Sequence, residues 1–196
     1  MNNSKPPLLV LLVAAAGACL PSGCGSAEPH KSGFEEPFGF TELRQMTAPI
    51  GAMKAPDAAA VSRLQGRGPR VAELYKDALA RFESIYGDGV GPARESPDFL
   101  GCKAVFRQVA GDIQQLPIAD TDLGVEATWK GLLRCRKVAN QWSGPAEMAT
   151  FGNDLEAMTE GSMLVLSYAA TASQMPAGRA HYLEAIAFDA GRKSAN

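Results

Sequence analysis

Histidine is scarce in this chain, with only His30 and His181 among 196 residues. Neither lies in an H-E-x-x-H sequence and no cysteine lies in a C-x-x-C-H sequence, so the signatures of zinc proteases and of covalently attached haem are absent. The chain also has no G-x-S-x-G elbow and no G-x-x-x-x-G-K-[ST] phosphate loop. These absences disfavour the enzymes that use such motifs, so we favour a noncatalytic protein and predict no cofactor.

The chain also has no excess of basic residues. Its 19 Lys and Arg residues face 21 Asp and Glu residues, which gives a formal net charge of −2. Because nucleic-acid-binding domains carry a basic footprint, we predict no nucleic-acid partner. A length of 196 residues with 46% hydrophobic composition is enough for one domain with a substantial core.

Long apolar runs are missing too, and the one that stands out is short. Residues 8–18 contain no charge and follow Lys5. A bilayer core requires about 20 helical residues, so this run does not predict a permanent span. A positive start, a short apolar core and small residues before a cut site predict a secretory signal. Pro6, Pro7 and Pro21 frame the run closely and disfavour the alternative, a buried core helix.

Residues 20–24, Leu-Pro-Ser-Gly-Cys, place small residues directly before Cys24. Together with the apolar run, this segment resembles the export signal of bacterial lipoproteins, and the resemblance covers residues 1–25. In that family the cysteine is lipidated and becomes the first residue of the mature protein. The resemblance implies that Cys24 carries the lipid, with Cys19 as the alternative. Gly25 stands where an aspartate would favour the inner membrane, so the resemblance implies export to the outer membrane of the cell envelope.

Four segments follow from these features. We expect a signal peptide over residues 1–23, a lipid-anchored flexible tether over 24–55, a helical domain over 56–192 and a tail over 193–196. The start of the tether is small and polar, as flexible linkers are.

Three aromatic residues interrupt this polar tether. Phe34, Phe38 and Phe40 lie within seven residues of each other, which is unusual for a linker. Two interpretations stay open: the rings dock onto the chain's own domain, or they form a partner-binding segment that folds on contact.

Apolar residues beyond the tether recur at helical spacing. We expect a short helix over 57–65, a break at 66–69 because Gly and Pro disfavour helix, and a second helix over 71–85. Ser96 should cap a third helix that ends before Pro117.

Two further long helices complete the expected domain. The fourth should run from Asp120 or Thr121 to Trp142, and the fifth apolar stripe extends from Met148 to Ala169. A last helix should follow Pro176. No segment alternates as a strand would, so we predict an all-α fold: an antiparallel bundle of four main helices with short accessory helices.

Two cysteines lie on the apolar faces of successive predicted helices. Cys102 and Cys135 would meet an oxidising compartment after export, where disulfides persist. A bridge between them would close about 34 residues and stabilise the fold by roughly 3–4 kcal/mol. We predict this disulfide, with two buried inert thiols as the alternative. A metal or redox role is less favoured because the pair forms no C-x-x-C motif.

The remaining polar residues give weaker hypotheses. The Glu residues of the helices are expected on solvated faces, although Glu156 and Glu160 are one turn apart and can in principle chelate a metal. Arg134 and Lys137 are expected to share an exposed helix face with Arg136 nearby. His181 is expected to be an ordinary helix residue; a haem site would combine it with a methionine, namely Met148, Met158 or Met163.

Two function classes remain. The leading hypothesis is a noncatalytic, lipid-anchored envelope protein that binds another envelope component. The alternative is a binder of a small molecule, haem or metal, with a pocket inside the bundle.

Overall fold

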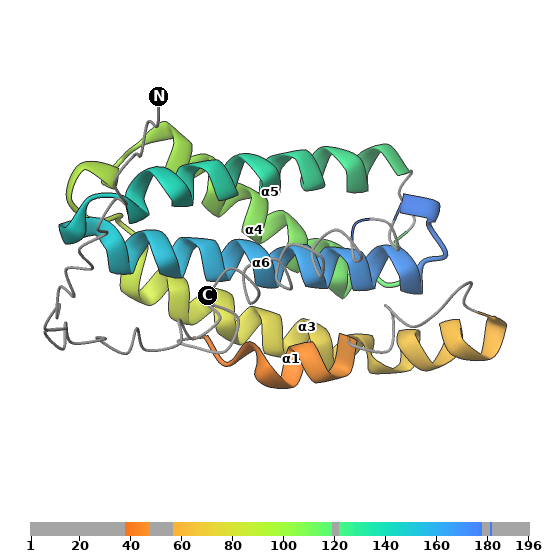
Figure 1. Ribbon diagram of the computed structural model, residues 1–196. Coiled ribbons are helices and arrows are strands. Elements are labelled where there is room, and N and C mark those ends of the chain that lie inside the picture. The colour runs from red at the N-terminus through yellow and green to blue at the C-terminus, as the bar shows by residue number, and fades with distance from the viewer. Residues whose placement is uncertain (1–37, 48–56, 119–121, 178–180, 182–196) are drawn as a thin grey trace, which may run out of the picture.

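Five α-helices make up the computed structural model, which describes residues 38–47, 57–118, 122–177 and 181 (Figure 1). They are α1 (Phe40–Thr47), α3 (Ala58–Tyr86), α4 (Pro97–Gln114), α5 (Asp122–Ser143) and α6 (Ala149–Ala172). Short 3-10 turns at Gly91–Ala93 and Ala146–Met148 lead into α4 and α6. No strand occurs within these ranges, and the predicted all-α fold is confirmed.

The four long helices run alternately in opposite directions, so consecutive helices are antiparallel neighbours (Figure 1). Contacts join α3 to α4, α4 to α5, and α5 to α6, and α6 returns to pack on α3. Short connections between long amphipathic helices favour this arrangement, because each apolar stripe must be covered by the next helix.

Helix α6 is the centre of the bundle. It contacts α1, α3, α4 and α5, and every residue from Ala157 to Ala172 is buried. A helix that is apolar all round belongs in a core. Its four buried Ser and Thr hydroxyls donate to the carbonyl oxygen four residues earlier, which leaves none of them unsatisfied; they belong to Thr159, Ser162, Ser167 and Thr171.

The predicted break at residues 66–69 is wrong. Helix α3 continues through Pro69 although proline removes a helix hydrogen bond and costs about 3 kcal/mol. Buried residues on both sides, including Leu64 and Val71, share one face. A Cβ at Gly68 would lie 2.6 Å from Cδ1 of Leu116, so the glycine lets this side chain pack directly against the helix. Tertiary packing of a continuous apolar face therefore overrides the local preference.

The helix starts agree with the sequence only in part. Pro97 opens α4 as expected, but the Ser96 hydroxyl makes no capping hydrogen bond. Asp57 does cap a helix: its Oδ1 accepts from the Ala60 amide of α3 at 2.7 Å. The predicted caps Asp120 and Thr121 lie outside the described residues.

The domain begins earlier than the expected boundary at residue 56. Helix α1 packs on α3 and α6, and Phe38, Phe40 and Leu43 belong to the core. Residues 38–47 are therefore part of the bundle and not of a flexible tether. None of the helices in the described ranges is both long enough and apolar enough to cross a membrane.

Candidate functional site

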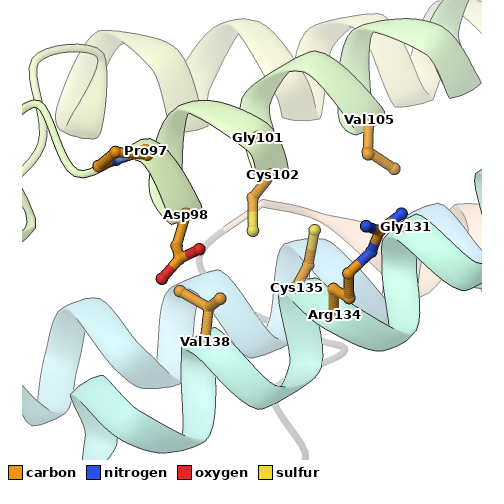
Figure 2. Close-up of a pocket in the computed structure, with 9 residues that line it drawn as sticks. All are labelled: Pro97, Asp98, Gly101, Cys102, Val105, Gly131, Arg134, Cys135 and Val138. Carbon is orange, nitrogen blue, oxygen red and sulfur yellow. The ribbon is translucent and has the colours of Figure 1, made fainter.

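A pocket of about 350 Å³ opens between α4 and α5 (Figure 2). Helix α4 and its neighbour α5 line it with mostly small or apolar residues, two thiols and two charged groups: Pro97, Asp98, Gly101, Cys102, Val105, Gly131, Arg134, Cys135 and Val138. Pockets of roughly 300–1,000 Å³ with a few polar groups are typical of small-molecule sites. We therefore take this pocket as the candidate site.

Two glycines shape the pocket in different ways. A Cβ at Gly131 would lie 2.8 Å from Cγ2 of Val105, so α4 and α5 approach closely there. A Cβ at Gly101 would meet no atom within 4 Å, which means that this residue leaves open space. The two helices touch at one glycine and leave a hollow at the other.

The sulfur atoms of Cys102 and Cys135 point toward one another across the two helices (Figure 2). The residues are only 2% and 1% exposed, and both are free thiols. A hydrogen bond with Cys102, together with burial, raises the pKa of the Cys135 thiol, while the charge of Arg134 opposes that rise. The helices thus bring the two cysteines together, and the disulfide between them stays a prediction.

Charged side chains flank the thiols. Figure 2 shows Asp98 and Arg134 on opposite sides of the sulfur pair. Arg134 and Lys137 are both exposed on α5, as expected, and Lys130 continues their row one turn earlier. Arg136 is half-buried instead, and its Nη2 lies 3.0 Å from Sδ of Met163. The pocket therefore opens beside a cationic helix face.

His181 lies against α5. Its ring stacks on Trp129 at a centroid distance of 4.3 Å, and its Nε2 lies 3.2 Å from a carboxylate oxygen of Glu126. Met148, Met158 and Met163 are buried in the core. The structure thus places His181 in a stacking contact with Trp129 and beside the Glu126 carboxylate.

The expectation that Glu160 lies on a solvated face is wrong. The residue is 3% exposed because α6 is enclosed by helices on all sides, whereas Glu156 is half-buried. No group of three or more His, Cys, Asp and Glu side chains is placed to hold a metal ion within the described ranges.

The tether residues fall into two sets. Phe38 and Phe40 pack into the core of their own chain, so neither ring is available to a partner in this structure. Their positions fit the docking interpretation and not the partner-binding one. Phe34, Cys19 and Cys24 lie outside the described residues.

Several polar contacts of the core were not indicated by the sequence. Tyr75 Oη lies 2.6 Å from Ser162 Oγ, and Tyr86 Oη donates to a carboxylate oxygen of Asp154 at 2.6 Å. These tyrosines belong to no sequence motif, and their partners lie 68 or more residues away in the chain.

The two pocket glycines were weakly indicated by the sequence, because Gly101 adjoins Cys102 and Gly131 precedes Cys135 by one helical turn.

Comparison with protein-family models finds no matching family, and comparisons with curated proteins and with solved structures find no match either.

Proposed function

We propose that the protein is a noncatalytic, lipid-anchored module of a bacterial cell envelope that binds another envelope component. The observation that carries this proposal is the sequence of residues 20–24, with its small residues before Cys24, directly after a short apolar run. A short charged start and an apolar core of this length are those of an export signal.

The short distance from Cys24 to the folded domain supports an anchored module. Thirteen residues separate Cys24 from Phe38, the first core residue. Even a fully extended segment of this length spans only about 50 Å. A lipid on Cys24 would therefore hold the bundle close to the membrane surface.

The exposed cations of α5 support an acidic partner. Lys130, Arg134 and Lys137 lie on successive turns and are all exposed, so they present one positive row. Complementary charge speeds association and selects partners. Replacement of Arg134 and Lys137 by glutamate should abolish photocrosslinking to the partner from a probe at Asn140, while the same reversal at Arg63 on α3 should not.

Fractionation of cells and intact mass test the anchor. Cys24→Ser should release the protein from membranes and remove the acyl mass, whereas Cys19→Ser should leave both unchanged. The opposite pattern would move the anchor to Cys19. Wild-type protein without any acyl mass in the native host would contradict the proposal.

A second candidate function, binding of a small ligand, is favoured by the α4–α5 pocket. Gly101 lines this pocket, and a Cβ at this residue would meet no protein atom within 4 Å. Gly101→Leu should therefore abolish a noncovalent mass seen in native spectra of the wild type. Gly111→Leu, on the same helix and also with no atom within 4 Å, is the matched control. A native spectrum that shows only the bare chain would count against this second function.

A further inference from the structure

We propose that the reduced Cys102–Cys135 pair is a two-sulfur site for a soft metal ion of low coordination number, for which Cu(I) is the probe. This inference rests on the second candidate function, because it names the ligand class of the α4–α5 pocket. It concerns the thiol form of the pair, in which the structure describes both residues.

The arrangement of the two sulfur atoms supports a bridging ion. They come from neighbouring helices, point at each other (Figure 2) and line the same pocket. Metal–thiolate bonds are about 2.3 Å long for zinc, so two sulfurs that hold an ion in line between them lie about 4.6 Å apart.

The donor set selects the kind of ion. Thiolate sulfur prefers soft ions such as Cu(I), whereas Ca²⁺ and Mg²⁺ take oxygen ligands. Structural zinc takes four ligands, and no group of three or more His, Cys, Asp and Glu side chains is placed to hold a metal ion among the described residues. Two sulfurs complete the coordination of a linear monovalent ion, which is the state that Cu(I) adopts with two thiolates.

The charge beside the two thiols and the access to them through the pocket also suit a bound cation. Binding forms two metal–sulfur bonds, breaks two S–H bonds and releases two protons to water, with no electron transferred. The product, one monovalent cation with two thiolates, carries one negative charge. Arg134 lies beside Cys135 and lines the same pocket, so its positive charge offsets that of the complex. The pocket gives an ion a route to sulfurs that are otherwise almost fully buried.

Anaerobic titration of the full-length protein tests this inference. The protein is kept reduced by a phosphine, and Cu(I) is supplied as the complex of a chromophoric chelator. We expect one Cu(I) per chain and an ultraviolet thiolate-to-copper charge-transfer band. Loss of an outer-shell partner already weakens metal binding by roughly 10–100-fold, so Cys102→Ser or Cys135→Ser should weaken it by about 100-fold or more.

Controls keep the result decisive. Gly111→Leu changes α4 away from the pocket and should bind like the wild type, and circular dichroism checks that both serine variants fold. The inference is overturned if the wild type takes no more Cu(I) than the double serine variant. It is also overturned if Zn(II) displaces Cu(I) at equal concentration. An organic ligand that is lost in Gly101→Leu, without any Cu(I) binding, would remove the metal inference and leave the second candidate function standing.

Discussion

The ring of Phe40 lies where a side chain at Gly161 would lie. A Cβ built at residue 161 of α6 would be 2.5 Å from Cζ of Phe40, and Phe40 is only 1% exposed. Phe38 packs beside it with its ring centroid 6.0 Å away, and also contacts Phe82 of α3 at 5.6 Å. This contact joins the N-terminal segment to the central helix of the bundle.

Gly161→Ala should therefore destabilise the fold. The added methyl group forces the Phe40 ring to move, and such overpacking costs about 1–3 kcal/mol, which exceeds the gain of about 0.5–1 kcal/mol from replacing a helical glycine. A Cβ at Gly111 would meet no atom within 4 Å, so Gly111→Ala should show only the gain in stability from replacing a helical glycine. Urea unfolding of the two variants measures the difference, and equal midpoints would contradict the proposed contact.

The Tyr86–Asp154 hydrogen bond should set part of the pH dependence of stability. Burial raises the pKa of the Asp154 carboxyl, and the hydrogen bond from Tyr86 opposes that rise. Because the folded state holds this proton more tightly than the unfolded chain, the contribution of Asp154 is greatest in acid. It falls as the pH rises from the unfolded pKa of about 3.9 through the raised folded value.

Tyr86→Phe should widen that pH effect. Without the hydroxyl the pKa of Asp154 rises further, so the variant should lose about 1 kcal/mol relative to the wild type at neutral pH and less at about pH 4. Asp154→Asn removes the titration and is the control: as the pH rises over this range, the wild type should lose stability relative to it. Thermal midpoints of the three proteins measured across this pH range test the prediction. If the difference between Tyr86→Phe and the wild type stays constant with pH, the hydrogen bond does not set the pH dependence.

The buried Tyr75–Ser162 contact should show energetic coupling. Tyr75 Oη also lies 3.2 Å from the carbonyl oxygen of Phe106, and burial raises the pKa of Tyr75, so the group stays protonated. Tyr75→Phe should cost about 1–2 kcal/mol. In a cycle with Ser162→Ala, measured by urea unfolding, the coupling should be about 0.5–1.5 kcal/mol. Additive effects would mean that the two hydroxyls do not interact.

Oxidation of the Cys102–Cys135 pair should stabilise the fold. A bridge that closes about 34 residues contributes roughly 3–4 kcal/mol, and its formation lowers the intact mass by two hydrogens. A mild oxidant should raise the thermal midpoint of the wild type but not of Cys102→Ser. The oxidised protein should also take no Cu(I), because both sulfurs are used. Thiols that remain titratable after oxidation of the folded protein would reject the bridge.

Local patterns predicted α4 well and α3 poorly. In α4, Pro97 begins the helix and apolar residues such as Phe99 and Phe106 form its buried stripe, so spacing and start signal agree. In α3, Pro69 favours a break locally, yet the helix continues because the residues on both sides are buried on one face. The cost of Pro69 to the helix can be predicted from the local sequence. The distant packing partners that outweigh this cost cannot.

The candidate site, too, was predictable from the sequence only in part. Successive amphipathic helices predicted that Cys102 and Cys135 would be neighbours, and they are. The hollow at Gly101 was not predictable, since it depends on how closely α4 and α5 approach at Gly131. Glu160 was predicted wrongly, and the two interpretations of Phe40 could not be separated, for one reason. Whether a side chain is exposed depends on what packs against its helix, and nothing near either residue in the sequence gives that information.

By itself, the sequence determined the helical class, most helix boundaries and the faces that the cysteines occupy, because these depend on residues three or four apart. Only the tertiary structure decided that α6 is enclosed, that the segment at Phe38 belongs to the core, and that a pocket opens over the thiols. Those features depend on contacts between residues far apart in the chain, where the apolar area buried outweighs any local preference.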